Sequence, residues 1–317
     1  MMLKQYIPGV FLAIAISVVA KLVSFAIPIG LVLGALIIGM IVGNIISSLK
    51  TFSVGLKFSE SRILEIAIVL IGFGIDASNL SRLNFSLAAF IIIMILAVML
   101  LSVLLGKLFK IDFRLSVLLG AGNAICGSAA IAATAPLINA KEEEIGVSLG
   151  ATNLLGTIAL ALVPGIAFFF TFSEFDSAVL VGATLQSIGH VAASSFSMSE
   201  EIGEWAMMVK MGRVVLLVPF LLAVYVLGKG KSNAKVKFPW FVLLFVCSMF
   251  ISNSEWVSDS INSSLAVTGN YLMAIAMAAI GIGIRIKPLL KISGKGLVLS
   301  TLVFAVQIAM VVMYLNF

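Results

Sequence analysis

Apolar runs of about 18 residues or more recur along the whole chain, and they constrain its fold more than any other feature. A run of that length crosses the hydrocarbon core of a bilayer as one helix. Hydrophobic residues occupy 62% of the 317 positions and charged residues 11%. A soluble domain carries about 25% charged residues, so water is excluded as the main solvent. The sequence therefore predicts an all-α integral membrane protein.

Windows of about 19 residues predict about eleven transmembrane helices. They cover residues 7–25, 29–48, 62–77, 85–107, 114–138, 144–171, 177–196, 206–228, 239–254, 265–285 and 293–316. The spans 62–77 and 239–254 are short for complete crossings. The connections between spans leave no room for a soluble domain, so we expect a single transmembrane transporter domain over 1–317.

Positive charge gathers in alternate loops, which predicts the orientation of the chain. Cations cluster in the segments 50–62, 107–114, 229–237 and 285–295, whereas acids dominate 142–144, 200–204 and 255–259. Because cytoplasmic loops carry the excess of Lys and Arg, the N-terminus is predicted in the cytoplasm and the C-terminus outside. The net charge of +6 is spread over these loops, which argues against a nucleic-acid partner.

Two segments look like copies of each other. Residues 63–80 and 272–289 share Ile-Ala, then Ile-Gly-x-Gly-Ile, then Leu at matching offsets. They lie seven crossings apart. Because this number is odd, the two copies cross the membrane in opposite directions. This predicts inverted structural repeats, as in many secondary transporters, with repeat-like segments 29–138 and 239–317. The alternative is chance similarity between two helices rich in Ile, Gly and Ala.

Glycines and small polar residues interrupt the span 114–138 at its centre. They suit a helix that breaks near the bilayer midplane inside the protein. A break exposes backbone N–H groups, whose dipole favours an anion. The alternative is close helix packing through small residues. The substrate-binding residues predicted here are Gly122, Asn123, Cys126, Gly127 and Ser128.

The span 177–196 is the second predicted broken helix. It carries Gln186, Ser187 and His190, the sole histidine of the chain, and we assign all three to the substrate site. Polar groups at this depth usually face a cavity or one another, although a lone histidine can also be a packing residue. Residues 181–192 echo residues 119–130. Because both spans run in the same direction in the predicted topology, this echo is not an inverted repeat.

Lys210 and Arg213 lie three residues apart in the span 206–228, on one helical face. We expect them to point into the protein and to supply positive charge to an anion site. The alternative is that both side chains reach the outer headgroups. Elsewhere, Arg62 and Glu65 are spaced for an i,i+3 ion pair.

The motifs GNAICGSAAIAATAP, GATLQSIGHVAAS and KMGRVVLLVP resemble, in this order, the YeiH family of bacterial inner-membrane proteins, also named sulfate exporters. The resemblance covers nearly the whole chain and implies a transporter for sulfate, sulfite or a related oxyanion. It also implies a distant similarity to the bile-acid and sodium symporter folds. Gln186 and Ser187 stand where that family has a histidine and an acid, so an acid that could carry a proton or sodium is absent.

The sequence therefore predicts a secondary transporter of the inner membrane that moves a small anion by alternating access. The alternatives are an anion channel and a non-transport membrane component. An enzyme is disfavoured, because the chain has one histidine, two distant cysteines and no paired intramembrane acids. We expect no metal site and no cofactor. The coupling ion is a proton carried by His190 or a sodium ion held by freed carbonyls. By analogy with other two-domain carriers, we expect a homodimer in the lipid bilayer.

Overall fold

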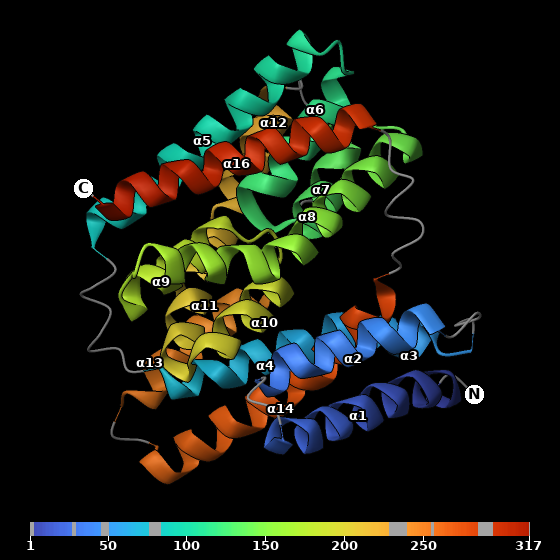
Figure 1. The fold of residues 1–317 in the computed structure, drawn as a ribbon, viewed down its shortest axis with the longest axis vertical. Coiled ribbons are helices and arrows are strands. Elements are labelled where there is room, and N and C mark those ends of the chain that lie inside the picture. The colour runs from blue at the N-terminus through green and yellow to red at the C-terminus, as the bar shows by residue number, and fades with distance from the viewer. Residues whose placement is uncertain are drawn as a thin grey trace. The chain divides into compact units, whose positions relative to one another are not determined.

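The computed structural model describes residues 3–26, 30–45, 51–75, 84–227, 240–254, 257–284 and 294–316. All regular secondary structure within these ranges is helical (Figure 1). In a lipid solvent the backbone must satisfy its own hydrogen bonds, and helices do so within one segment. The all-α prediction is therefore confirmed.

Six helices in the described ranges are long and apolar enough to cross a membrane. They are Gln5–Phe25, Phe85–Leu108, Glu142–Phe169, Glu200–Val226, Asp259–Gly283 and Gly294–Asn316. Shorter apolar helices cover Leu31–Ile45, Phe113–Cys126, Ser128–Leu137 and Trp240–Ser252. Each predicted span overlaps at least one helix, but the count of eleven crossings and the inverted repeats stay predictions.

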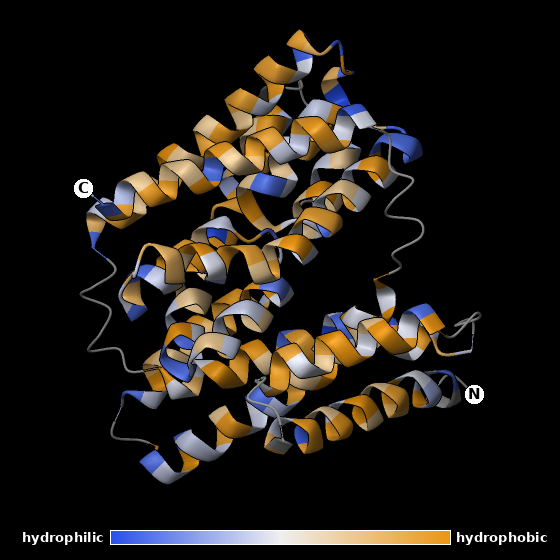
Figure 2. Ribbon diagram, in the orientation of Figure 1, coloured by the Kyte–Doolittle hydropathy of each residue, from blue (hydrophilic) through white to orange (hydrophobic). Residues whose placement is uncertain are grey.

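Large apolar side chains lie exposed on these helices. Phe11 is 69% exposed, and Phe85 and Phe168 are each 87% exposed. Figure 2 shows hydrophobic residues along most of the length of α5 (Phe85–Leu108) and α16 (Gly294–Asn316). Apolar surface of this extent is unfavourable in water and suits contact with lipid.

The chain divides into two compact units, each of which is described by itself. Unit 1 comprises Met1–Arg82, Ala192–Glu204 and Trp240–Ile286, and unit 2 comprises Leu83–Val191, Trp205–Pro239 and Lys287–Phe317. The helices α10 (Ile188–Met198) and α11 (Glu200–Val215) contribute residues to both units. The single transporter domain over 1–317 stays a prediction.

Unit 1 also contains α1 (Leu3–Ala26), α2 (Leu31–Ile45), α3 (Ser53–Phe58), α4 (Leu64–Ile71), α13 (Trp240–Ser252) and α14 (Asp259–Gly283). Glycines let α2 and α14 approach closely. A Cβ on Gly39 would lie 2.4 Å from the carbonyl oxygen of Ala278, and one on Gly281 would lie 2.2 Å from that of Leu36. Such close approach through small residues is typical of helix packing in membranes.

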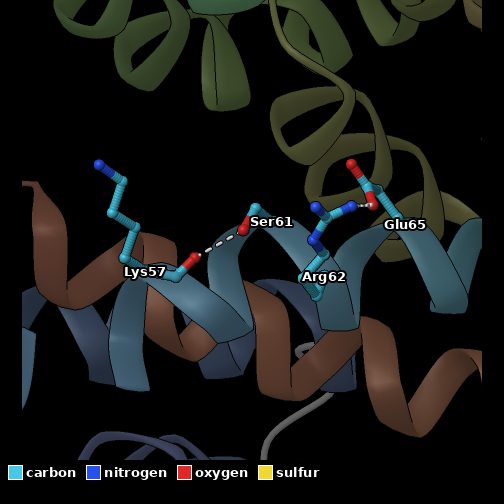
Figure 3. Close-up of polar contacts among 4 residues, drawn as sticks. All are labelled: Lys57, Ser61, Arg62 and Glu65. Atoms are coloured by element: carbon cyan, nitrogen blue, oxygen red, sulfur yellow. Dashed lines mark hydrogen bonds and ion pairs between the residues drawn. The ribbon is translucent and has the colours of Figure 1, made fainter. Parts of the chain in front are cut away.

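The segment predicted as span 62–77 begins earlier than expected. α3 continues through a π-helical turn, Ser59–Ile63, into α4 and ends in a short 3₁₀ turn, Gly72–Gly74. Arg62 and Glu65 form the predicted ion pair, with Nη1 and Oε2 at 2.9 Å (Figure 3). Asp76 and Arg285, which follow Ile-Gly-x-Gly-Ile in the two similar segments, lie outside the described residues.

Unit 2 contains α5, α6 (Phe113–Ala121), α7 (Ser128–Thr134), α8 (Glu142–Phe169), α9 (Glu174–Thr184), α12 (Leu217–Leu227) and α16. α16 packs against α5, α6, α8 and α9, and Figure 1 shows it running alongside α5. Ser102 Oγ of α5 donates to the carbonyl oxygen of Ser116 in α6 at 2.7 Å. These helices surround the two interrupted segments that build the candidate site.

Candidate functional site

The first interruption lies at Gly127. α6 runs into a π-helical turn, Gly122–Cys126, and α7 begins directly after Gly127. Gly127 has φ +64° and ψ −124°, a conformation that residues with a Cβ rarely adopt. Because the helix stops here, its last carbonyl oxygens lack the usual N–H partners and need other donors.

The second interruption lies between α9 and α10. Leu185 has φ −61° and ψ 140°, which is extended backbone, and α10 begins three residues later at Ile188. Ser187 caps α10, because its Oγ accepts a hydrogen bond from the backbone N–H of His190 at 3.1 Å. The last turn of α9 therefore also presents carbonyl oxygens that need donors.

Lys210 and Arg213 supply these donors. Lys210 Nζ donates to the carbonyl oxygens of Ile125 at 2.7 Å, Leu185 at 2.7 Å and Gln186 at 2.6 Å. Arg213 makes five hydrogen bonds of 2.8 to 3.2 Å, to the carbonyl oxygens of Asn123, Ala124, Gly182 and Leu185. Each cation therefore bonds both interruptions and holds them side by side.

Both cations are 0% exposed, so neither side chain extends to headgroups. In the part of the chain that the structure describes, no carboxylate lies within ion-pair distance of either one. A helix end carries only about half a negative charge. The carbonyl ends of two half-helices thus supply less negative charge than the positive charge of two protonated cations.

Amide side chains surround the same region. Asn123 Nδ2 donates to the carbonyl oxygen of Leu119 at 2.9 Å and to Ser300 Oγ at 2.8 Å. Gln186 Nε2 donates to Asn123 Oδ1 at 3.3 Å. Gln307 Nε2 donates to the carbonyl oxygen of Ala183 at 2.9 Å. These contacts tie α16 to both interruptions.

Ser300 and Gln307 were missed from the sequence, although a signal was present. They are buried polar residues seven positions apart in a mostly apolar helix, which puts them on one face. Polar atoms near the interruptions are also buried without a hydrogen-bond partner among the described residues, namely Thr152 Oγ1, Gln186 Oε1 and Gln307 Oε1. Burial of such an atom costs free energy unless a water or a ligand forms a hydrogen bond with it.

His190 lies beside α8. Its Nδ1 is 2.8 Å from Ser187 Oγ, and the ring is packed against Gly156. A Cβ on Gly156 would lie 2.3 Å from His190 Cε1. Because Gly156 has no side chain, the imidazole of His190 can pack directly against α8.

The structure brings together most of the predicted site residues within unit 2. Asn123 and Gln186 are bonded to each other, and Cys126 is buried at the end of the first interrupted helix. Gly122 and Gly127 lie against Thr152, while Ser187 and His190 contact each other. Ser128, which directly follows Gly127, is exposed rather than buried.

The fold and the buried polar groups define a multi-pass, all-α membrane protein. The chain belongs to the family described as conserved hypothetical protein 698, whose model matches residues 8–300. A UPF0324 membrane protein of Streptococcus agalactiae serotype V is 31% identical over 315 residues, which cover 95% of this chain and 94% of the relative. The resemblance seen in the sequence motifs is confirmed, since the UPF0324 inner membrane protein YeiH of Escherichia coli K12 is also a relative. It is 30% identical over 265 residues, 81% of this chain and 76% of YeiH. No solved structure matches the chain.

Proposed function

We propose that this protein is a secondary transporter that moves a small anion, such as sulfate or sulfite, by alternating access. The observation that carries the proposal is the burial of Lys210 and Arg213 without a carboxylate partner in the described residues. Burying a charge is costly unless opposite charge and hydrogen bonds compensate it. A substrate anion would supply the missing negative charge.

In this proposal the two cations do not ligate the anion directly. Their hydrogen bonds already go to the carbonyl oxygens of the interruptions. They fix the shape of the site and attract the anion through the potential that they create. Direct donors come from side chains with spare capacity, above all the Thr152 hydroxyl, which is buried without a partner.

Flux into proteoliposomes tests this function. We expect the purified chain to take up labelled sulfate or sulfite above the rate of protein-free liposomes, and uptake to saturate with concentration. Imposed proton and sodium gradients would identify the coupling ion. Single-channel currents without saturation would instead favour the anion channel. Absence of flux for both anions under every gradient would contradict the proposal for these substrates.

Thr152→Val gives a specific test of the site. The variant keeps the shape of the side chain and removes a hydroxyl that has no partner, so the fold should be at least as stable as before. We expect weaker apparent affinity for the anion. Thr157→Val on the same helix is the matched control, because the Thr157 hydroxyl donates to the carbonyl oxygen of Asn153 away from the site. Equal transport by both variants would remove Thr152 from the proposed site.

The arrangement in the bilayer is also part of the proposal. It has eleven crossings with inverted repeats, the N-terminus in the cytoplasm, the C-terminus outside, and two copies forming a homodimer. The relative YeiH is called an inner membrane protein, which supports an inner-membrane location. Labelling of single cysteines placed at each terminus from either side of the membrane would check the orientation. Cross-linking in the membrane would check the homodimer.

A further inference from the structure

Unit 1 contains a cavity of about 260 Å³ with two opposite charges in its wall. A water molecule takes up about 30 Å³ in the liquid, so the cavity has room for a small polar group. The residues that matter for its chemistry are Lys21, Phe196, Glu200, Asn270 and Tyr271. They come from α1, α10, α11 and α14.

Aromatic rings hold the cation of this cavity in place. Lys21 Nζ lies 5.3 Å from the ring centroid of Phe25 and 5.6 Å from that of Tyr271. Cation–π contacts of this kind orient an ammonium group but do not neutralise it. Lys21 and Glu200 form no ion pair with each other in the described structure, so both charges remain for a ligand.

The cavity wall also presents acceptors. Asn270 Nδ2 donates to Glu200 Oε1 at 3.4 Å, which orients the amide beside the carboxylate. Asn270 Oδ1 is buried and has no hydrogen-bond partner in the described part of the chain. A carboxylate beside an unsatisfied carbonyl oxygen is suited to a group with several N–H donors and a positive charge, namely a primary ammonium.

The surroundings of the cavity indicate where such a ligand comes from. Leu22 is 63% exposed and Phe25 is 78% exposed on α1, and Val267 of the cavity wall is also exposed. Apolar side chains in these positions fit the acyl chains of a lipid. A freely diffusing polar solute has no apolar part that would pack against these side chains.

We propose that this cavity binds the headgroup of a phospholipid that carries a phosphate and a primary ammonium, as in phosphatidylethanolamine. Lys21 pairs with the phosphate, while Glu200 and Asn270 Oδ1 accept hydrogen bonds from the ammonium. The site lies in unit 1 and is independent of the anion site proposed in unit 2.

Native mass spectrometry of the purified full chain tests the proposal by measuring apparent affinities for added lipids. The probes are phosphatidylethanolamine, phosphatidylcholine and phosphatidylglycerol with identical acyl chains. We expect phosphatidylethanolamine to bind about tenfold more tightly than phosphatidylcholine, whose methylated ammonium has no N–H donors. Equal affinities for the three lipids would overturn the proposal.

Two variants separate the two halves of the site. Lys21→Gln should weaken phosphatidylethanolamine binding about tenfold through loss of one charge-assisted contact. Glu200→Gln keeps an acceptor for Asn270 but removes the negative charge, so it should abolish the preference for phosphatidylethanolamine over phosphatidylcholine. An unchanged preference in Glu200→Gln would contradict the assigned role of the carboxylate.

Matched controls are available in the same unit. Glu201→Gln changes an exposed neighbour of Glu200, and Lys57→Gln removes an exposed cation on α3. Neither residue lines the cavity, so both variants should keep the wild-type preference. Soluble phosphoethanolamine should bind far more weakly than the lipid. Comparable affinity for this soluble compound would overturn the lipid as the source of the headgroup.

Discussion

Lys210 Nζ and Arg213 Nη1 donate to the same backbone oxygen, that of Leu185, at 2.7 and 3.1 Å. Two buried cations that share one acceptor repel each other. The arrangement is tolerated because further carbonyl oxygens from both helix interruptions surround the pair. The cations therefore brace the two broken helices, and in the proposed function they also attract the anion through their potential.

Removal of one cation should destabilise the fold. Lys210→Met keeps most of the side-chain volume but leaves three buried carbonyl contacts without their donor. We expect a loss of about 3 kcal/mol in unfolding free energy, measured by thermal or denaturant unfolding in detergent. Lys107→Met is the control, because Lys107 is exposed at the end of α5. Equal stability of the two variants would contradict the bracing role.

The contact between Gly156 and His190 predicts a second effect. In Gly156→Ala the new methyl group would lie 2.3 Å from His190 Cε1, so the ring must move. We expect a destabilisation of about 1 to 3 kcal/mol. Gly146→Ala on the same helix should be neutral or slightly stabilising, because a Cβ there meets nothing within 4 Å and alanine has the higher helix propensity.

A double-mutant cycle checks that His190 is the cause. His190→Ala removes the ring, so Gly156→Ala should cost much less in that background. An equal cost in both backgrounds would show that the strain arises from another neighbour.

The positions of the helices could be predicted because the thickness of the bilayer fixes the length of apolar runs. The helix that contains the predicted span 62–77 extends beyond the start of that span, because the segment from Ser53 is helical although Lys57, Glu60 and Arg62 lower its hydropathy. Hydropathy indicates whether a segment prefers lipid or water. A segment that prefers water can still be helical, so hydropathy does not show where a helix begins.

The glycines indicated an interruption in the span 114–138, but side-chain patterns did not predict what Lys210 and Arg213 would bind. Both bind backbone carbonyl oxygens, and every residue type carries that acceptor. The sequence therefore contains no signal for the pairing. The seven-residue spacing of Ser300 and Gln307 indicates a shared polar face, but two residues are weak evidence for it in a helix of 23 residues.

The link between α16 and the first interruption gives a third prediction. Ser300→Ala removes the Oγ that accepts from Asn123 Nδ2 at 2.8 Å, while Nδ2 keeps its contact with the carbonyl oxygen of Leu119. We expect a loss of about 1 kcal/mol in unfolding free energy. Thr301→Ala is the control, since the Thr301 hydroxyl donates to the carbonyl oxygen of Leu297 within the same helix. A larger cost for Thr301→Ala than for Ser300→Ala would refute the proposed link.

Close packing of α2 against α14 gives the last prediction. In Gly281→Ala the added Cβ would lie 2.2 Å from the carbonyl oxygen of Leu36 and 2.9 Å from the backbone nitrogen of Met40. Backbone atoms cannot rotate away as a flexible side chain can, so the two helices must separate. We expect a destabilisation of about 1 to 3 kcal/mol, measured by unfolding in detergent. Gly283→Ala is the matched control two residues along α14, because a Cβ there meets nothing within 4 Å. Both variants raise helix propensity by a similar amount, so the difference between them isolates the contact with α2. If Gly281→Ala is as stable as Gly283→Ala, the close approach of the two helices is not a requirement of the fold.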